Sequence, residues 1–290
     1  MKNKKGRTVQ SHINTLFAAI EGIIKPEVTR EEKVLIAGVG SGGGRVAEEL
    51  VRIGIQEIVL LDKPGEKLEV RNIFRHTLGH SDIGRLKTVA MRDRLKDINP
   101  GCKVTCANID VVSTPDKLPP LLQGVSQVYI CVDNEEARHV INQAGVEAGI
   151  HEMILGAVFD GGCGGEVGRI KPEGACYACM TAFLERTVPP PTFGEEKPID
   201  YSNPNKGTPK STPALNMDIA QIAILMARIG LQSILGRTNP EDDFRGNYLL
   251  FGNRVVKDLF PYPLFSKTYI IPKTEGCLIC GSVKDNFPGR

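Results

Sequence analysis

Three glycines near the start of the chain are spaced to bind a phosphate group. Gly38, Gly40 and Gly43 form the pattern G-x-G-x-x-G directly after an apolar run at residues 34–37, which predicts a buried strand. The first glycine permits a tight turn, the second lets backbone N–H groups approach a phosphate, and the third lets the next helix pack against the strand. Residues 46–53 have the apolar periodicity of that helix, whose N-terminus attracts anions.

Two aspartates follow predicted buried strands. Asp62 ends the apolar run 58–61, about 20 residues beyond the last glycine, where an acid accepts hydrogen bonds from ribose hydroxyls. Asp133 follows the apolar run 127–132. Because parallel strands end at one edge of a sheet, both carboxylates are expected beside the phosphate loop, which indicates a nucleotide with its Mg²⁺. A tight turn without a ligand is the alternative explanation of the glycines alone.

Four of the eight cysteines form two C-x-x-C pairs that lie far apart in the sequence. They are Cys176 with Cys179, and Cys277 with Cys280. In a cytosolic chain this pattern favours a metal over disulfides, and four thiolates supply a closed, tetrahedral and structural zinc site. We expect each pair in a short turn. A redox pair is the alternative, and it would place one pair at the start of a helix.

The elements that must position these residues alternate between strands and helices. Strands are predicted at residues 34–37, 58–61, 103–109, 127–132 and 152–159, and antiparallel strands at 248–251, 255–260 and 268–271. The order predicts an α/β fold, with a Rossmann-like, mostly parallel sheet, helices on both faces and an antiparallel C-terminal extension. A glycine-rich stretch follows residue 158, and a long apolar helix is predicted at 214–235.

The chain is predicted to have one main domain. Residues 1–30 are expected to form an N-terminal helical extension, in which a helix at 12–24 ends before Pro26. Residues 31–290 form the domain itself, with a crossover loop at about 181–213 that has no apolar periodicity.

Composition excludes several classes of protein. The 290 residues are 41% hydrophobic and 24% charged, with a formal net charge of +2, as in ordinary soluble domains. No convincing basic patch predicts a nucleic-acid partner. No uninterrupted apolar run reaches the roughly 18 residues of a membrane helix, and no signal-peptide pattern is present. A cytoplasmic location without a membrane partner is therefore expected.

Several motifs together resemble one known family. They are the glycine loop, LLD ending at Asp62, N-x-x-R at Asn72 and Arg75, IGRLK ending at Lys87, CVDNEEARHVIN from residue 131, and the two cysteine pairs. In this order they resemble the ubiquitin-activating-enzyme superfamily of MoeB, ThiF and HesA type. The segment CVDNEEARHVIN is also similar to the activating enzyme of ufmylation.

The resemblance implies adenylation. In this family the C-terminal glycine carboxylate of a ubiquitin-like or sulfur-carrier protein attacks the α-phosphate of ATP and releases pyrophosphate. The family's pattern assigns catalysis to Arg75, Lys87 and Asp133, and the Mg²⁺ to Asp133. It also implies a homodimer, a Gly-Gly-ended carrier as partner, and Zn²⁺ at the four cysteines. The implied nucleotide-binding residues are Gly38, Gly40, Ser41, Gly42, Gly43, Asp62, Asn72, Arg75, Lys87, Asp133 and Asn134.

The chain departs from the family pattern at several positions. Pro64 stands where relatives often carry a second acid, which leaves open whether Glu66 substitutes for it. His76 replaces a glutamine, and the N-terminal arginine motif that reaches the partner subunit is absent. Residues 180–216 contain no cysteine, so we expect the reaction to stop at the adenylate, with Cys163 as the fallback for a thioester.

Other functions are compatible with parts of the pattern. The glycines and Asp62 alone would permit a nicotinamide-dependent dehydrogenase, although we find no hydride-transfer acid–base pair. Within the superfamily, a peptide C-terminus, another acyl substrate or a transfer-RNA base could replace the carrier protein. The zinc quartet argues against the transfer-RNA branch. A non-catalytic subunit that pairs with an active one is the last alternative.

Overall fold

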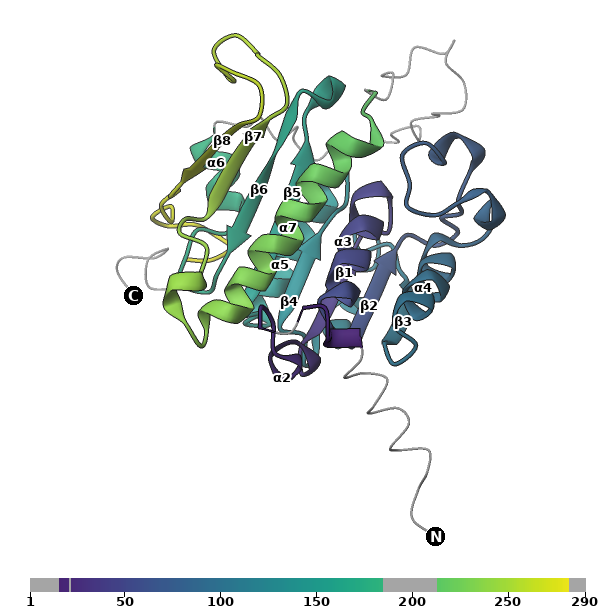
Figure 1. The fold of residues 1–290 in the computed structure, drawn as a ribbon. Helices are drawn as coiled ribbons and strands as arrows, with labels where there is room; N and C mark the ends of the chain where they lie inside the picture. The colour runs from purple at the N-terminus through teal and green to yellow at the C-terminus, as the bar shows by residue number, and fades with distance from the viewer. Residues whose placement is uncertain (1–15, 21, 185–212, 282–290) are drawn as a thin grey trace.

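The chain forms one eight-stranded sheet (Figure 1). The structure is a computed structural model that describes residues 16–20, 22–184 and 213–281. The strand order is β3-β2-β1-β4-β5-β6-β7-β8. The strands are β1 Lys33–Ala37, β2 Glu57–Asp62, β3 Lys103–Asn108, β4 Gln127–Ile130, β5 Glu152–Val158, β6 Gly164–Ile170, β7 Tyr248–Gly252 and β8 Phe265–Tyr269. The five strands from β3 to β5 are parallel, and β6, β7 and β8 extend the sheet in antiparallel pairs.

Helices cover both faces of this sheet. They are α2 Pro26–Arg30, α3 Ser41–Arg52, α4 Lys87–Ile98, α5 Glu135–Glu147, α6 Tyr177–Phe183 and α7 Asn216–Gly236. Successive residues of a strand point to opposite faces, so Ile36 packs with α3, α4 and α7, whereas Leu35 packs with α5 and α6. The predicted α/β fold, with its mostly parallel sheet and antiparallel extension, is confirmed.

The long helix α7 belongs to the core. It is long and apolar enough to cross a membrane by length and composition alone. In the structure it lies on the sheet beside α3, and Ile222, Met226 and Ile229 are buried there (Figure 1). A core helix of a soluble domain passes the same compositional test, so the helix is explained by its packing.

Several predicted elements were wrong in detail. The glycine-rich stretch after residue 158 contains β6, which the prediction missed because glycine is a poor strand former. Residues 255–260 form a loop with one bridge, Val256 to Phe260, instead of a strand. Pro26, expected to end a helix, is the first residue of α2, where its missing N–H costs nothing. Of the helix predicted at 12–24, residues 12–15 and 21 lie outside the described residues; residues 16–17 are helical, whereas 18–20 and 22–23 form turns.

The strand order creates a site at one edge of the sheet. β1 pairs with β2 on one side and with β4 on the other, so the chain leaves β1 where the order of the strands reverses. In open α/β sheets, ligands bind beyond the carboxyl ends of the strands at such a switch point. The glycine loop after β1, Asp62 at the end of β2 and Asp133 after β4 therefore share this edge, as the sequence predicted.

Candidate functional site

The three glycines of the loop have three different surroundings. Gly38 has a φ of +89°, and an added Cβ would lie 2.8 Å from the carbonyl oxygen of Cys131. A Cβ on Gly43 would lie 1.8 Å from the carbonyl oxygen of Gly38, so α3 can approach β1 only with glycine there. A Cβ on Gly40 would meet no atom within 4 Å. Gly40 therefore borders open space, where the fingerprint places the phosphate.

The N-terminus of α3 opens into this space. Gly40 is its N-cap residue and makes no side-chain capping bond, and the first turn carries no acidic residue. Ser41 and Gly42 begin the helix, and Ile219 of α7 lies against Gly42 at 3.8 Å from its added Cβ. The free N–H groups and the helix dipole thus give a twelve-residue helix an anion-binding end.

Asp62 is fixed by backbone bonds from the loop beside it. Its Oδ2 accepts a hydrogen bond from the N–H of Val39 at 3.1 Å, and its Oδ1 accepts one from Lys63 at 2.9 Å. Burial raises the pKa of this carboxyl group, while these bonds and the charge of Lys87 oppose the rise. The aspartate is therefore a half-buried acceptor beside the glycine loop, which suits a ribose hydroxyl.

The crossover segment between β2 and α4 brings the predicted cations over the same edge. Arg75 is half-buried, and its guanidinium makes no hydrogen bond or ion pair with any residue that the structure describes. Lys87 begins α4, and its Nζ lies 2.6 Å from Oε2 of Glu66. Glu66 thus pairs with the predicted catalytic lysine. Asn72 has a structural task, since its Oδ1 caps the short helix η1 Val70–Asn72 by accepting from Glu69 N–H at 2.9 Å.

Asp133 and Asn134 lie in the turn between β4 and α5. Asn134 is the N-cap of α5, and its Oδ1 accepts a hydrogen bond from Ala137 N–H at 2.8 Å. Asp133 is exposed and makes no ion pair or hydrogen bond within residues 16–20, 22–184 and 213–281. Its carboxylate is therefore accessible to a cation, and its binding of Mg²⁺ stays a prediction, whereas the side chain of Asn134 is used by the helix.

Two residues that connect these parts were not identified from the sequence as parts of the site. His76 is buried between the crossover segment and the glycine loop, and its Nε2 lies 3.0 Å from the carbonyl oxygen of Val39. Asn216, the first residue of α7, donates from Nδ2 to the carbonyl oxygen of Arg75 at 2.6 Å. The substitution at His76 was visible in the motif, but nothing in the sequence gave its contact with the loop.

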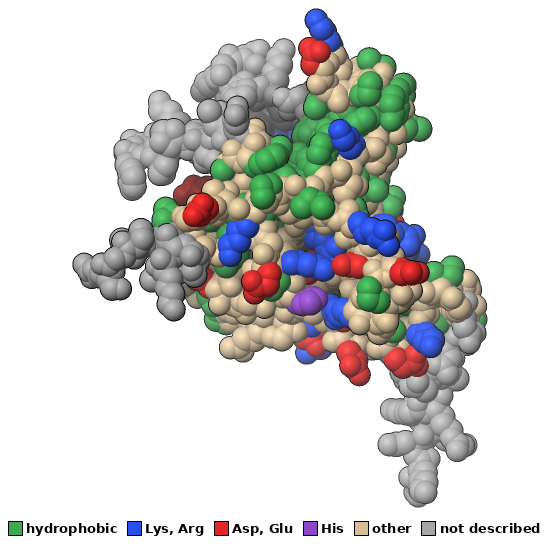
Figure 2. Space-filling view, turned by 90° about the vertical axis from the view of Figure 1, so that its left-hand side faces the viewer, with side chains coloured by type: hydrophobic (Ala, Val, Ile, Leu, Met, Phe, Trp, Pro, Cys, Tyr) green, Lys and Arg blue, Asp and Glu red, His purple; other side chains and the backbone are tan. Residues whose placement is uncertain are grey.

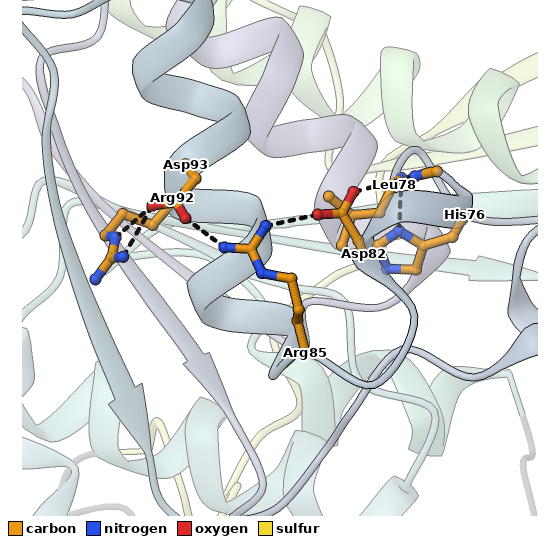
Figure 3. A network of polar contacts seen from close by, with 7 residues as sticks. His76, Leu78, Asp82, Arg85, Arg92 and Asp93 are labelled. Carbon is orange, nitrogen blue, oxygen red and sulfur yellow. Dashed lines mark hydrogen bonds and ion pairs between the residues drawn. The ribbon is translucent and has the colours of Figure 1, made fainter.

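The crossover segment is also tied to α4 by a chain of charges (Figure 3). Arg85 donates to Asp82 at 2.7 Å and forms a second ion pair with Asp93 on α4. Asp93 also accepts from its neighbour Arg92 at 2.8 Å. These pairs are partly exposed, so each contributes little alone, but together they fix the turn that follows His76.

The four cysteine sulfurs converge on the other face of the sheet. Their Sγ atoms all lie within 4.8 Å of one another, with separations of 3.9 Å from Cys176 to Cys179, 3.8 Å from Cys176 to Cys277 and 3.5 Å from Cys179 to Cys280. A tetrahedral zinc with bonds of about 2.3 Å places its sulfurs about 3.8 Å apart. The cluster therefore fits Zn²⁺, which the four thiolates would hold.

The setting of the first cysteine pair differs from the prediction. Cys176 is the N-cap of α6 and Cys179 lies within that helix, so this pair is not in a turn. Burial opposes ionisation of Cys179, but hydrogen bonds from Thr274 and Cys176 outweigh it and lower the pKa of the thiol to about 7. A helix start alone would suit a redox pair. Convergence with the second pair favours the metal.

The next residue connects this cluster to the Asp133 turn. The hydroxyl of Tyr177 donates to Oε2 of Glu135 at 2.6 Å, and its N–H donates to Oδ1 of Asn142 at 2.9 Å. Glu135 is the first residue of α5, two positions beyond Asp133. The cysteine cluster thus supports, through α5, the turn that carries the predicted magnesium ligand.

Cys163, the fallback residue for a thioester, lies near the glycine loop. Cys163 is half-buried in the turn between β5 and β6, at the same edge of the sheet as the glycine loop, and its carbonyl oxygen accepts from Asn253 N–H at 2.8 Å. Most of the crossover loop predicted at 181–213 lies outside the described residues. The absence of a cysteine there is a fact of the sequence.

Comparison with known proteins gives consistent matches. A model described as the ThiF family matches residues 15–261. Ubiquitin-like modifier-activating enzyme 5 of Caenorhabditis elegans is 32% identical over 169 residues, which are 54% of this chain and 39% of the relative. The enzyme of the same name from Dictyostelium discoideum is 33% identical over 169 residues, 54% of this chain and 44% of the relative. The match thus spans about two fifths of these curated relatives.

Solved structures share the fold at lower identity. A crystal structure of E. coli MccB with MccA-N7isoASN has a TM-score of 0.65 and 19% identity, and covers 89% of this chain and 69% of that chain. SeMet PaaA has a TM-score of 0.63 and 17% identity, and covers 93% of this chain and 85% of that one. At such identity these likenesses bear on the fold alone.

Proposed function

The chain belongs to the ThiF family, as its motifs indicated, and from this we propose that it is an ATP-dependent adenylating enzyme. Its proposed substrate is the C-terminal glycine carboxylate of a ubiquitin-like or sulfur-carrier protein. The observation that carries most weight is the set of groups at the switch point of the sheet. An uncapped helix start, a ribose-type acid, and an arginine and an aspartate without a partner among the described residues lie at this edge.

The chemistry would be one displacement at phosphorus. An oxygen of the substrate carboxylate forms a bond to the α-phosphorus of ATP, the bond from that phosphorus to the bridging β-phosphate oxygen breaks, and pyrophosphate leaves. The N–H groups at the start of α3 would hold a phosphate, and Asp62 would orient the ribose. Arg75 and Lys87 would neutralise the charge that moves onto the leaving phosphates. Asp133 would hold Mg²⁺, which would supply positive charge to neutralise the phosphates.

Lys87 must change partner during this reaction. Its ammonium is paired with Glu66 at 2.6 Å in the structure. Glu66 is about two-fifths exposed, and an ion pair of that exposure contributes at most about 1 kcal/mol. Phosphate oxygens can therefore compete for the lysine at little cost.

Relatives support two kinds of acyl substrate. The relatives at 32–33% identity are named as ubiquitin-like modifier-activating enzymes, which favours a carrier protein. A peptide C-terminus is the second candidate, and it rests on the family resemblance together with the fold that this chain shares with MccB, which has been solved with MccA. In either case we propose that the reaction ends at the adenylate, because residues 180–216 contain no cysteine. A cytoplasmic homodimer is proposed on the family resemblance.

A pyrophosphate-exchange assay tests the proposal. Purified chain is incubated with ATP, Mg²⁺, labelled pyrophosphate and a Gly-Gly-ended carrier, or with a peptide in a parallel reaction. Carrier-dependent exchange that is lost in Lys87→Ala and Asp133→Ala supports adenylation at this site. Lys117→Ala, an exposed lysine on the stretch before β4, is the matched control and should exchange normally. ATP binding without exchange on any acyl substrate would reject the proposed reaction.

A nicotinamide-dependent dehydrogenase would give the opposite binding results. It would bind NAD(H) at the same glycine loop and would not need Arg75, Lys87 or Asp133. Tight NADH binding that is unaffected by Lys87→Ala, together with no ATP binding, would restore that alternative.

A further inference from the structure

His76 is a buried polar side chain at the junction of three elements. It is only 7% exposed and lies between the glycine loop, α3 and α4. An added Cβ on Gly44 of α3 would come within 3.4 Å of its Cε1 and within 2.8 Å of Met91 on α4. Met91 and Thr77, at 2.8 and 2.9 Å from this Cβ, are the neighbours that require glycine at position 44, and the ring of His76 lies in ordinary contact beside them.

Both ring nitrogens have a fixed partner. Nε2 lies 3.0 Å from the carbonyl oxygen of Val39, which can only accept a hydrogen bond. Nδ1 accepts the N–H of Leu78 at 3.1 Å, as Figure 3 shows. Nε2 must therefore carry the proton and Nδ1 the lone pair, which defines the neutral Nε2–H tautomer.

We propose that His76, as this neutral tautomer, is a positioning residue that locks the glycine loop to the crossover segment carrying Arg75. The inference rests on the proposed function, because it concerns how the same nucleotide site is assembled. It adds a residue that touches neither nucleotide nor substrate, and it gives the site a dependence on one protonation state.

The loop is held from two sides at a single residue. The N–H of Val39 donates to Asp62, and the carbonyl oxygen of Val39 accepts from His76. Val39 lies between Gly38 and Gly40, so these two bonds fix the peptide planes that precede the start of α3. His76 thus sets the position of the N–H groups that would face a phosphate.

The same histidine fixes the arginine. His76 directly follows Arg75, and the N–H groups of both residues donate to the carbonyl oxygen of Asn72 at 2.9 Å. Asn216 binds the carbonyl oxygen of Arg75 from the other side. The backbone of Arg75 is therefore anchored at each end, while its guanidinium has no partner among the residues that the structure describes. A shift of His76 would move the glycine loop and the arginine apart.

Protonation would break the bond from Leu78, which holds the ring within the crossover segment, and would leave the bond to Val39 in place. A second proton on Nδ1 would face the N–H of Leu78 and remove that hydrogen bond. The charged groups that face the ring are Lys87 at the start of α4, Asp82 on the crossover and Glu48 on α3. Burial lowers the pKa of His76, Lys87 adds to the fall, and the Val39 bond and the two acids oppose it. The neutral form is thus favoured near pH 7 and lost in acid.

Calorimetric titration with Mg·ATP tests the inference on the full chain, from pH 8 to pH 5.5. His76→Ala removes the link, and His76→Gln keeps an amide donor for Val39 but cannot titrate in this range. His80→Gln, an exposed histidine on the same segment, is the control. We expect His76→Ala to weaken ATP binding about tenfold at pH 7.5, since it leaves a buried carbonyl without a donor, and His76→Gln to stay within about threefold.

The pH profile separates positioning from simple packing. ATP itself titrates in this range, so the measured quantity is the ratio of wild-type to His76→Gln affinity, in which that effect cancels. The ratio should fall by up to about tenfold for each pH unit below the pKa of His76, while the ratio of wild type to His80→Gln stays constant. Imidazole ¹⁵N shifts should show the neutral Nε2–H tautomer at pH 7.5.

The results distinguish this inference from the proposed function. If the wild type binds ATP but the affinity ratio to His76→Gln is independent of pH, the role of His76 is rejected and the adenylating site stands. A charged ring or an Nδ1–H tautomer at pH 7.5 would reject it as well. If the wild type binds no ATP at pH 7.5, both the function and the inference fall.

Discussion

Loss of the cysteine cluster should cost the chain several degrees of thermal stability. Cys277→Ser removes one of the four sulfurs that converge within 4.8 Å. The metal would join Cys176 to Cys277 and close a loop of about 100 residues, and a cross-link of that length contributes about 4.7 kcal/mol through chain entropy. With an unfolding entropy of about 2.1 cal/mol/K per residue, the 290 residues give a fall in Tm of about 8 °C.

The test combines metal content with thermal unfolding. Mass spectrometry of the purified chain should find one zinc per protein, and chelation with EDTA should lower Tm about as far as Cys277→Ser does. Cys163→Ser is the matched control, because this thiol is half-buried but outside the cluster. A chain without zinc, or a Cys277→Ser variant as stable as Cys163→Ser, would show that the cluster does not cross-link the fold through a metal.

Two further predictions concern the glycine loop and a buried glutamate. Gly43→Ala should destabilise the fold by about 3 kcal/mol or more in denaturant unfolding, because its Cβ meets a carbonyl oxygen at 1.8 Å. Gly40→Ala should unfold like the wild type yet bind ATP about tenfold more weakly. Equal free energies of unfolding for Gly40→Ala and Gly43→Ala would refute the roles assigned to the two glycines. Burial raises the pKa of Glu152 to about 7 from 4.5, so its contribution to stability is full below pH 4.5 and is lost as the pH rises to 7. The stability of Glu152→Gln relative to wild type should therefore rise across this window, by up to about 3 kcal/mol, whereas that of the exposed Glu173→Gln should not.

The parallel half of the sheet could be predicted because its signals are local. The apolar runs before the glycine loop and before Asp62 are the strands β1 and β2, with boundaries that differ by one residue. The antiparallel half was harder. β6 has three glycines in seven residues, and its pairing with β5 and β7 supplies the order that its own residues do not. Such pairing is tertiary and leaves no local pattern.

The residues of the candidate site also divide into those that a local pattern predicts and those that only the fold brings together. Gly38, Gly40, Gly43 and Asp62 are linked by spacing, and the structure brings them together as the fingerprint requires. The contact of His76 with Val39 joins two segments 37 residues apart. No periodicity encodes such a contact, since it depends on how the crossover folds back over the sheet. Sequence reasoning therefore found the groups that would touch the nucleotide and missed those that hold them.

The charge of Arg75 has no partner among the residues that the structure describes. An arginine shielded from solvent normally pairs with an acid, as the buried Arg169 does with Glu152 at 2.7 Å. Arg75 instead has its backbone bonded to Asn72 and Asn216, while its guanidinium has no partner in the part of the chain that the structure describes. Fixing the backbone without pairing the charge gains little for folding, but it lowers the cost of ordering the side chain when an anion arrives. A preorganised, unpaired cation over an uncapped helix start is thus better explained by a bound polyphosphate than by the stability of the fold.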